Sequence, residues 1–317
     1  MTAKRRDTVG VVGGGRWGLA LAAAARRAGR PAMLYTRRED PLAQKLEIEV
    51  TTDLRALAGR TTLVLVAVPS EVVRDVARQL GDVVDGSHYV VHGIRGLSGE
   101  GLTLISDVLR EETSARRVGA LGGPAVADDL VAGNPGVVAV ASRFPEVTHA
   151  VQDALGSAWV RVSALSDLTG LEWASALNGC LFVALGFGRA IGASPALLAG
   201  LLTRGLHEAS RIGAAAGADP TTFFSIAGVG DLMAALGEDH RPEVRFGRAL
   251  AEGATLDEAR ERAGLRIEAP TLLPRVVAFA KERRVEATVF QTMDAALKGT
   301  ISREEIVHNL MVRSHGH

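Results

Sequence analysis

The sequence contains little cysteine and little lysine. Cys180 is the only cysteine among 317 residues, which excludes a framework of internal disulfides and suits a reducing compartment. We therefore expect a cytoplasmic protein. Lysine occurs only at positions 4, 45, 281 and 298, so arginine supplies most of the 36 basic residues. This scarcity matters wherever the chemistry of a site would use an ammonium group.

An excess of charge of one sign is also absent, and we expect neither a signal peptide nor a membrane span. The 36 basic residues equal the 36 acidic ones, so no long-range field favours nucleic acid or an anionic membrane. The basic residues at positions 4–6 precede Asp7 and a glycine-rich segment, where a signal peptide needs an apolar stretch. The longest uncharged run, Ala174–Gly188, is too short to cross a bilayer and predicts a buried helix.

Clusters of histidine and cysteine at metal-ligand spacing are missing too, and so are the G-x-S-x-G elbow and the G-x-x-x-x-G-K-[ST] phosphate loop. We therefore expect no metal site, and neither a nucleophilic serine hydrolase nor a P-loop enzyme.

The length and the hydrophobic pattern predict two domains. A chain of 317 residues is long enough for two cores. In the first half, short β-branched runs alternate with helical stretches, which is typical of a parallel sheet covered by helices. After about residue 165 only segments of helical period remain. We predict a doubly wound α/β domain over residues 1–165 and an all-α domain over residues 166–317.

The expected elements follow from the same pattern. Strands are predicted at Thr8–Val12, Pro31–Thr36, Leu63–Val68, His88–Val91, Val118–Leu121 and Val137–Ala141. Helices are predicted at Trp17–Ala28, Ser70–Leu80, Gly170–Gly192, Ala196–Ala216, Val244–Glu252, Thr271–Glu282 and Ser302–Met311.

A glycine-rich motif joins the first predicted strand to the first predicted helix. Residues 13–18 read Gly-Gly-Gly-Arg-Trp-Gly, which is the G-x-G-x-x-G spacing of Rossmann domains. The glycines permit a tight turn, a close approach of the backbone to a pyrophosphate, and close helix–strand packing. The helix N-terminus offers free N–H groups to the phosphates. The pattern predicts dinucleotide binding, the alternative being a glycine-rich turn without a special purpose. The expected cofactor contacts here are Gly13, Gly15, Arg16, Trp17 and Gly18.

The end of the second predicted strand indicates which cofactor binds. An NAD-specific site usually has an acidic residue there, which bonds the ribose 2′-hydroxyl. Here the strand ends in Tyr35 and Thr36, followed by Arg37 and Arg38. Two guanidiniums suit a 2′-phosphate, so we expect NADP(H) to be preferred and NAD(H) to be possible. The alternative is that both arginines are solvated at the start of a loop.

Six short motifs occur in order along the chain. They read Gly-Gly-Gly-Arg-Trp-Gly, Val-Pro-Ser, Gly-Gly-Pro-Ala-Val-Ala-Asp-Asp, Thr-Arg-Gly-Leu-His-Glu, Ala-Gly-Val-Gly-Asp-Leu and Arg-Phe-Gly. Together they resemble the motifs of bacterial NAD(P)-dependent glycerol-3-phosphate dehydrogenases over almost the full length. The matching segments are residues 13–18, 68–70, 122–129, 203–208, 227–232 and 245–247.

The resemblance implies a Rossmann domain followed by a helical domain, usually assembled as a homodimer. It implies the reversible reduction of dihydroxyacetone phosphate to sn-glycerol 3-phosphate. Through the matching positions it also implies cofactor contacts at Pro69, Ala127 and Glu268 and a substrate contact at Gly123.

The chain departs from the family where the family's chemistry lies. A lysine that acts on the substrate oxygen is replaced by Asn178, and a second lysine, in a Lys-Gly pair, is replaced by His92. The Arg-Asn pair that holds the substrate phosphate becomes Pro242 and Glu243, whereas Asp231 keeps its family identity. Losing one electrostatic stabiliser typically lowers a rate by about 100- to 1,000-fold.

Other residues can compensate for these losses. His92 lies at a predicted strand end, where a histidine can protonate a developing oxyanion; the alternative is a histidine bonded to backbone. Asn178 can orient a carbonyl, and Arg241 or Arg245 can reach a phosphate. Asp231 is a catalytic candidate, but its position before an apolar helix is also typical of an N-cap.

Three functions are consistent with these observations. The first is an NAD(P)H-dependent reductase of dihydroxyacetone phosphate. The second keeps hydride transfer but acts on another small carbonyl compound, without the phosphate. The third is a dinucleotide-binding homologue without catalysis. The partners expected are a small phosphorylated or carbonyl substrate and a second copy of the chain, with neither nucleic acid nor a membrane.

Overall fold

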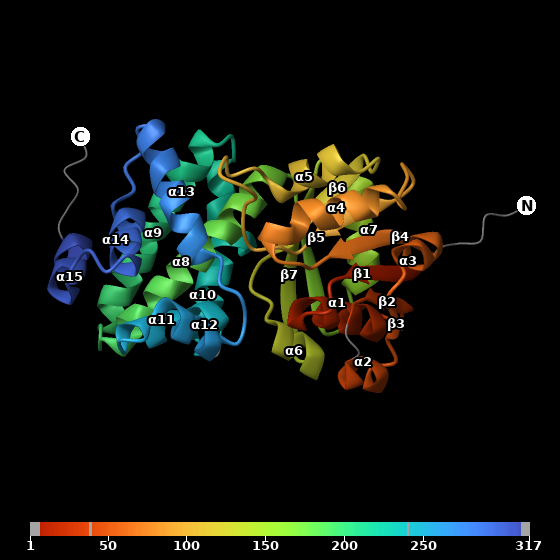
Figure 1. The fold of residues 1–317 in the computed structure, drawn as a ribbon, viewed down its shortest axis with the longest axis horizontal. Helices are drawn as coiled ribbons and strands as arrows, with labels where there is room; N and C mark the ends of the chain where they lie inside the picture. Colours follow the sequence, from red (N-terminus) through yellow and green to blue (C-terminus); the bar gives the residue numbers. More distant parts are fainter. Residues whose placement is uncertain (1–6, 38–39, 240, 312–317) are drawn as a thin grey trace, which may run out of the picture. The chain divides into compact units, whose positions relative to one another are not determined.

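The chain forms two compact units, which we describe separately. The computed structural model describes residues 7–37, 40–239 and 241–311. The first unit, here called the α/β unit, comprises residues up to 99 together with 103–172. The second, here called the helical unit, comprises residues 100–102 and those from Trp173 onward. The predicted combination of a doubly wound α/β fold with an all-α domain is confirmed (Figure 1).

The α/β unit is built on one sheet of eight strands in the order β3-β2-β1-β4-β5-β6-β7-β8. β1 pairs with β2 on one side and with β4 on the other, so the strand order reverses between β1 and β4. The strands are β1 (Thr8–Val12), β2 (Ala32–Tyr35), β3 (Glu49–Thr51), β4 (Thr61–Val66), β5 (Tyr89–His92), β6 (Arg117–Gly122), β7 (Gly136–Ser142) and β8 (Val160–Leu165).

The expectation of a wholly parallel sheet is wrong at one edge. β7 runs antiparallel to β6, and β8 runs parallel to β7. The short helix α6 (Ala127–Ala132) between β6 and β7 packs against α1 (Arg16–Arg27), and the chain then returns in the opposite direction. A parallel partner would have required a crossover connection. β3 and β8 were not predicted from the sequence.

Helices cover both faces of the sheet, as a doubly wound fold requires. One face carries a core that includes buried residues of α1, α6 and α7 (Pro145–Leu155). The other face carries a core from α3 (Leu54–Arg60), α4 (Val73–Gly81) and α5 (Ile105–Glu112). Two short elements complete this unit, namely α2 (Pro41–Lys45) and the 3-10 turn Ser70–Val72. The alanine-rich α1 is buried from Gly18 to Ala25, because small side chains let the helix lie close to the sheet.

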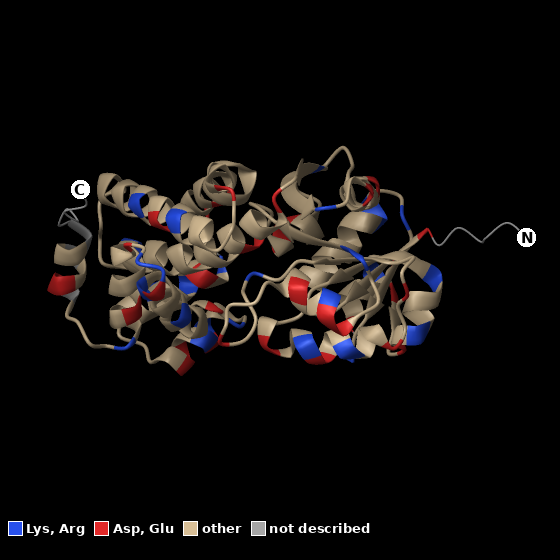
Figure 2. Ribbon diagram, turned by 90° about the horizontal axis from the view of Figure 1, so that it is seen from above, with Lys and Arg blue, Asp and Glu red and all other residues tan. Residues whose placement is uncertain are grey.

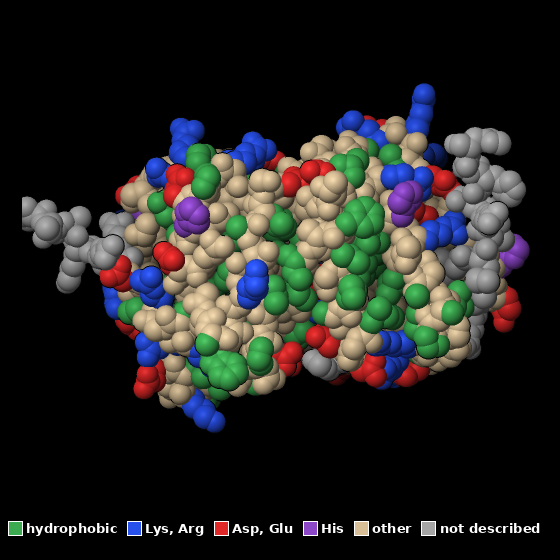
Figure 3. Space-filling model, turned by 180° about the vertical axis from the view of Figure 1, so that it is seen from behind, with side chains coloured by type: hydrophobic (Ala, Val, Ile, Leu, Met, Phe, Trp, Pro, Cys, Tyr) green, Lys and Arg blue, Asp and Glu red, His purple; other side chains and the backbone are tan. Residues whose placement is uncertain are grey.

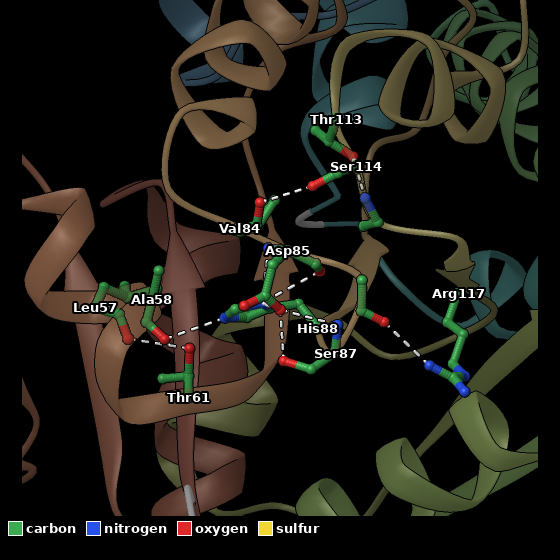
Figure 4. Close-up of polar contacts among 12 residues, drawn as sticks. Leu57, Ala58, Thr61, Val84, Asp85, Ser87, His88, Thr113, Ser114 and Arg117 are labelled. Carbon is green, nitrogen blue, oxygen red and sulfur yellow. Dashed lines mark hydrogen bonds and ion pairs between the residues drawn. The ribbon is translucent and has the colours of Figure 1, made fainter.

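A polar network closes the loop before β5, at the amino end of that strand (Figure 4). His88 is buried, and its Nε2 lies 3.1 Å from the Ala58 carbonyl oxygen. The Asp85 amide donates to His88 Nδ1 at 3.0 Å. Ser87 donates to the Asp85 carboxylate through its amide and its hydroxyl, which lowers the Asp85 pKa to about 2. Because one ring nitrogen is bonded within the loop and the other contacts α3, the role of His88 is structural.

The helical unit is organised around α8 (Leu168–Ala190), whose segment from Trp173 onward belongs to it. Among the described residues, α8 is the one helix long and apolar enough to cross a membrane, but 89% of its apolar window is buried. The prediction of a buried helix is therefore confirmed. The other helices are α9 (Pro195–Ala215), α10 (Asp231–Leu236), α11 (Pro242–Ala251), α12 (Leu256–Ala263), α13 (Ala269–Glu282), α14 (Thr288–Leu297) and α15 (Arg303–Met311), with the 3-10 turn Pro220–Phe224 and the π-helical turn Ile226–Gly230.

Close helix contacts explain the glycines of two sequence motifs. A Cβ added at Gly247 of α11 would lie 2.0 Å from the Val183 carbonyl oxygen of α8. In return, a Cβ at Gly186 of α8 would lie 1.9 Å from the Val244 carbonyl oxygen. A Cβ added at Gly205 of α9 would likewise lie 2.4 Å from Leu181 Cδ2 of α8. These positions exclude larger side chains, because helix backbones or core side chains occupy the space.

Charged side chains of both signs are interspersed over both units, as the balanced composition predicts (Figure 2). On the face drawn in Figure 3, hydrophobic side chains reach the surface most densely over the helical unit. Of the six large hydrophobic residues that are exposed in the described part of the chain, four belong to that unit, namely Phe224, Met233, Leu236 and Leu265.

Candidate functional site

The parallel strands bring most candidate residues of the α/β unit to one edge of the sheet. β1, β2, β4, β5 and β6 run in the same direction, so their carboxyl ends share that edge. Gly13, Arg37, Pro69, His92 and Gly123 lie at or directly after these ends. Ligands of doubly wound folds bind at this edge, where the strand order reverses.

The glycines of the loop after β1 are required by close contacts. Gly13 has a φ of +121°, and a Cβ there would lie 2.2 Å from the Ala67 carbonyl oxygen. A Cβ at Gly14 would lie 2.1 Å from Thr36 Oγ1, and one at Gly18 would lie 1.8 Å from the Gly13 carbonyl oxygen. Gly15 differs, because a Cβ there would meet nothing within 4 Å. The loop is thus tightly packed except at Gly15, where the backbone faces open space.

The N-terminus of α1 suits an anion. Gly15 is its N-cap and has no side chain to bond the first N–H groups, and the first turn contains no acidic residue. Unbonded N–H groups and the positive end of the helix dipole therefore point toward the open space beside Gly15. A pyrophosphate fits these features, so Gly13, Gly15 and Gly18 are placed as a dinucleotide site requires.

Arg16 and Trp17 occupy different surroundings within the first turn of α1. The Arg16 guanidinium forms an exposed ion pair with Asp128 of α6, with Nε donating at 3.0 Å. Trp17 packs against Gly93, where an added Cβ would lie 2.4 Å from the indole Nε1. Trp17 therefore connects the glycine loop to the segment that follows β5.

The remaining cofactor candidates lie on separate segments. Arg37 is exposed after β2, and Arg38 lies outside the described residues. Pro69 is exposed after β4 and precedes the turn Ser70–Val72, while Ala127 begins α6. Glu268 belongs to the helical unit, at the N-cap position of α13 and without a capping bond from its side chain. Gly123, the substrate candidate after β6, is buried with a φ of +90°.

His92 is held by neighbours on both sides of its ring. Its side chain is 1% exposed, and Nδ1 accepts a hydrogen bond from the Ile94 amide at 3.3 Å. The neutral ring therefore carries its proton on Nε2. Nε2 lies 3.4 Å from Glu172 Oε2, although the alignment is too poor for a hydrogen bond. The histidine and the buried carboxyl group thus lie close together without a direct hydrogen bond.

Glu172 and Ser106 complete a buried polar cluster with His92. The Ser106 amide donates to Glu172 Oε2 at 3.3 Å. Three buried atoms of this cluster, His92 Nε2, Glu172 Oε1 and Ser106 Oγ, have no hydrogen-bond partner within the described chain. Buried polar atoms without partners are rare and often mark the place of a water molecule or a reacting group. Glu172 was not predicted from the sequence, although a lone carboxylate inside an apolar helix was a usable signal.

In the helical unit, Asn178 is fully buried on α8. Its amide nitrogen donates to the Gly228 carbonyl oxygen at 3.0 Å and, more weakly, to that of Ala227 at 3.4 Å. Its Oδ1 has no partner among the residues that the structure describes. The amide group therefore fixes the Ala-Gly-Val-Gly turn and leaves one acceptor oxygen available.

Asp231 and Arg241 form a buried ion pair. Arg241 Nη1 donates to Asp231 Oδ1 at 2.9 Å, and the guanidinium also bonds Glu238. Its Cζ lies 4.9 Å from the centre of the Phe182 ring, which adds a cation–π contact. Asp231 is 0% exposed and Arg241 3%. A guanidinium shared by two carboxylates has little positive charge left for a phosphate.

Asp231 is not an N-cap, so that alternative is wrong. The N-cap position of α10 is Gly230, whose φ of −61° and ψ of −42° are already helical. The chain enters α10 from the π-helical turn, and Ser225 caps this turn by accepting from the Ala227 amide at 3.2 Å. The Asp231 carboxylate pairs with Arg241 instead of capping the helix.

Arg245 is engaged in a structural contact. Its Nη2 donates to the carbonyl oxygens of Arg262 and Ala263, at 2.6 and 2.9 Å, where α12 ends. This satisfies carbonyl groups that a helix C-terminus leaves unbonded. Of the two arginines considered for a phosphate, neither has a guanidinium without protein partners. Among the described residues, no group of three or more His, Cys, Asp or Glu side chains can hold a metal ion.

Comparisons with known proteins agree with this architecture. A family model described as the N-terminus of NAD-dependent glycerol-3-phosphate dehydrogenase matches residues 42–148, and one for its C-terminus matches residues 167–308. Glycerol-3-phosphate dehydrogenase [NAD(P)+] of Azorhizobium caulinodans is 33% identical, covering 97% of both chains. A second such enzyme, from Salinibacter ruber, is 30% identical and covers 97% of this chain and 95% of its own.

Among solved structures, glycerol-3-phosphate dehydrogenase from Coxiella burnetii superimposes with a TM-score of 0.89 at 24% identity, covering 97% of this chain and 99% of that one. At that identity the match concerns the fold alone. The two family models and the full-length sequence relatives show that this chain belongs to the NAD-dependent glycerol-3-phosphate dehydrogenase family.

Proposed function

We propose that the protein is an NAD(P)H-dependent oxidoreductase that reduces dihydroxyacetone phosphate to sn-glycerol 3-phosphate. The observation that carries the proposal is the glycine loop at the point where the strand order reverses, with the uncapped N-terminus of α1 facing open space at Gly15. Family membership supports the reaction class. A small phosphorylated substrate, a homodimer and a cytoplasmic location belong to the same proposal.

The proposed chemistry requires a proton source. When bound, the nicotinamide supplies a hydride to the carbonyl carbon, so negative charge grows on the oxygen and must be stabilised and protonated. We assign the stabilisation to His92, whose Nε2–H would donate a hydrogen bond to the oxygen while the ring stays neutral, and the proton itself to solvent. The partnerless oxygen of Glu172 and the Ser106 hydroxyl offer a path for one bridging water. Asn178 keeps the Ala-Gly-Val-Gly turn in place through its amide.

The preference for NADP(H) rests on Arg37, which is exposed directly after β2. A guanidinium there can bond a 2′-phosphate, which NAD lacks. Replacing Arg37 by alanine is expected to weaken NADPH binding by about tenfold, since a charged hydrogen bond contributes roughly 1.5 to 3 kcal/mol. NADH binding should stay unchanged. Titrating both cofactors by fluorescence tests this, and an equal effect on both would exclude the 2′-phosphate contact.

A second candidate is the reduction of a small carbonyl compound without a phosphate. It is favoured by Arg241, whose charge is balanced by Asp231 and Glu238, and by Glu243, which adds another carboxylate next to it in sequence. Like charges repel strongly in a site of low dielectric, so these residues disfavour a phosphate dianion. A third outcome, cofactor binding without turnover, is motivated by the two missing lysines.

One experiment separates these outcomes. The purified chain is mixed with NADPH and dihydroxyacetone phosphate, or with small neutral ketones and aldehydes, and the loss of NADPH absorbance is followed. Turnover with the phosphate ester supports the main proposal. Turnover only with neutral compounds supports the second candidate, and tight cofactor binding without turnover supports the third.

His92 is tested against a matched control in the loop before the same strand. His92→Gln is expected to lower turnover by at least about 100-fold, as the loss of a hydrogen bond to the oxyanion does. His88→Gln, at the opposite end of β5, is expected to reduce stability but to leave turnover per folded molecule unchanged. Glu172→Gln should shift the pH profile of turnover. Unaltered turnover in His92→Gln would remove this histidine from the mechanism.

A further inference from the structure

A cavity lies entirely within the helical unit. Its volume is about 340 Å³, and its walls come from α8, α9, α11, α12, α14 and α15. It involves none of the residues discussed above as cofactor or substrate candidates. Because helices rather than long loops form the walls, the cavity belongs to the packed framework of this unit.

Small residues create the space. Ala184, Gly188 and Ala193 line the side formed by α8 and the turn after it, and Ala296 and Gly299 line the side formed by α14. A Cβ at Gly188 would lie 2.7 Å from Leu198 Cδ2, so α8 and α9 are in tight contact beside the cavity. The void is therefore not a sign of loose packing. It exists because short side chains stand where longer ones would fill it.

The lining is almost wholly apolar, with one notable polar group. Thr292 of α14 lines the cavity and is 4% exposed. This hydroxyl makes no hydrogen bond within the described chain, and it is not one of the fully buried atoms without a partner, so water in the cavity can reach it. A ligand oxygen would replace that water and take its hydrogen bond.

Charge at the cavity is already balanced. The only charged residue of the described lining is Lys298, at the C-terminal end of α14. Its Nζ lies 2.6 Å from Asp294 Oδ2, four residues earlier on the same helix. A charged group inside the cavity would remain unpaired, which is strongly unfavourable in apolar surroundings. The ligand that fits is therefore uncharged.

We propose that this cavity binds an uncharged, mainly apolar molecule of about a dozen non-hydrogen atoms that carries one hydrogen-bonding oxygen, such as a medium-chain ketone. The size follows from a comparison: an engineered apolar cavity of about 150 Å³ takes up benzene. The space here is roughly twice as large. The oxygen accepts the hydrogen bond of Thr292, and the alkyl chain lies against Ala184 and Ala296.

The test uses the full chain and three compounds of similar length: 2-decanone, decane and decanoate. Binding is measured by calorimetry without any cofactor, so the result is independent of the proposed enzymatic function. We expect 2-decanone to bind and to raise the melting temperature. Decane, which lacks the oxygen, should bind about 2- to 12-fold more weakly, as the loss of one hydrogen bond implies. Decanoate should bind more weakly still.

Three variants identify the site. Thr292→Val should remove the advantage of 2-decanone over decane, whereas Thr288→Val serves as the matched control, because Thr288 lies on the same helix outside the cavity. Ala184→Phe should abolish the binding of both compounds by filling the space. Circular dichroism and melting curves establish that each variant is folded.

Several outcomes would overturn the proposal. One is that no compound binds at millimolar concentration. Another is that Ala184→Phe binds 2-decanone as the parent does. A third is that saturation with 2-decanone dissociates an oligomer in analytical ultracentrifugation, because the cavity would then be occupied by a second copy of the chain.

Discussion

Two alanine substitutions in the glycine loop separate the packing of the loop from its contact with a cofactor. In Gly18→Ala the new Cβ would lie 1.8 Å from the Gly13 carbonyl oxygen, so the backbone of the loop must shift. In Gly15→Ala the new Cβ would meet nothing within 4 Å. Gly15 has a φ of −76° and a ψ of 174°, which alanine adopts without strain.

The expected magnitudes follow from these contacts. Overpacking typically destabilises by about 1 to 3 kcal/mol, so Gly18→Ala should lower the melting temperature by several degrees. Gly15→Ala should leave stability unchanged or raise it by about 0.5 kcal/mol, because alanine restricts the unfolded chain more than glycine does. Its methyl group, however, would occupy the space where we place the pyrophosphate. Cofactor binding should therefore fall by about 10- to 100-fold, the equivalent of one charge-assisted hydrogen bond.

The assay combines thermal melting without cofactor and calorimetric titration with NADPH and NADH. The informative result is the opposition between the two variants, since one loses stability and the other loses affinity. If Gly15→Ala bound both cofactors as tightly as the parent chain, the open space beside Gly15 would not be the pyrophosphate site, and the proposed function would lose its main support.

Three further predictions concern the helical unit. Burial raises the pKa of Glu208 to about 7. The folded protein thus keeps a proton that the unfolded chain, with a pKa near 4.5, releases; this stabilisation is complete below pH 4.5 and is lost as the pH rises through 7. Relative to Glu208→Gln, the free energy of unfolding of the parent chain, measured in urea, should fall by up to about 3 kcal/mol between pH 4.5 and pH 9. Parallel pH curves for the two proteins would contradict the assignment. Burial also raises the pKa of the Cys180 thiol, which is 0% exposed, so iodoacetamide should label it only as the protein unfolds; rapid native labelling seen by mass spectrometry would contradict this. Asp231→Asn should destabilise by about 3 to 5 kcal/mol, because it leaves the buried Arg241 with one carboxylate. The control Asp239→Asn, at an exposed ion pair, should cost at most about 1 kcal/mol, and equal melting temperatures for the two variants would refute the reasoning.

Local chemistry made the first part of the fold predictable. The strand Thr8–Val12 was predicted with the bounds that the structure has, and α1 differs from its prediction by one residue at each end. Both follow from a short apolar run, a glycine turn and an alanine-rich helix, which need no information from distant residues. The same holds for α8, whose uncharged sequence predicted its burial.

Pairing between distant segments was harder to predict. The direction of β7 depends on how the chain returns after α6, and the strand itself reads the same in either orientation. β8 alternates buried and exposed residues over only part of its length, and β3 has three residues, so neither gives a strong pattern.

In the candidate site, too, features set by local sequence were predictable and contacts between distant residues were not. The glycine loop could be found from its spacing, because each glycine answers a local need. Glu172 was missed, since its contact with His92 joins residues eighty positions apart. The pairing of Asp231 with Arg241 was missed as well, because the π-helical turn before α10 transfers the capping role to Ser225. Sequence spacing does not reveal such a transfer.

The close contact of α8 with α11, at Gly186 and at Gly247, has a consequence for protein engineering. Because backbone meets backbone there, α11 is anchored one turn beyond its first residues, Pro242 and Glu243. Those first residues can be exchanged while the helix axis stays fixed. Grafting the Arg-Asn pair of the relatives onto these two positions would therefore alter the charge at a fixed place in the scaffold, which makes this helix start a suitable point for redesigning substrate choice.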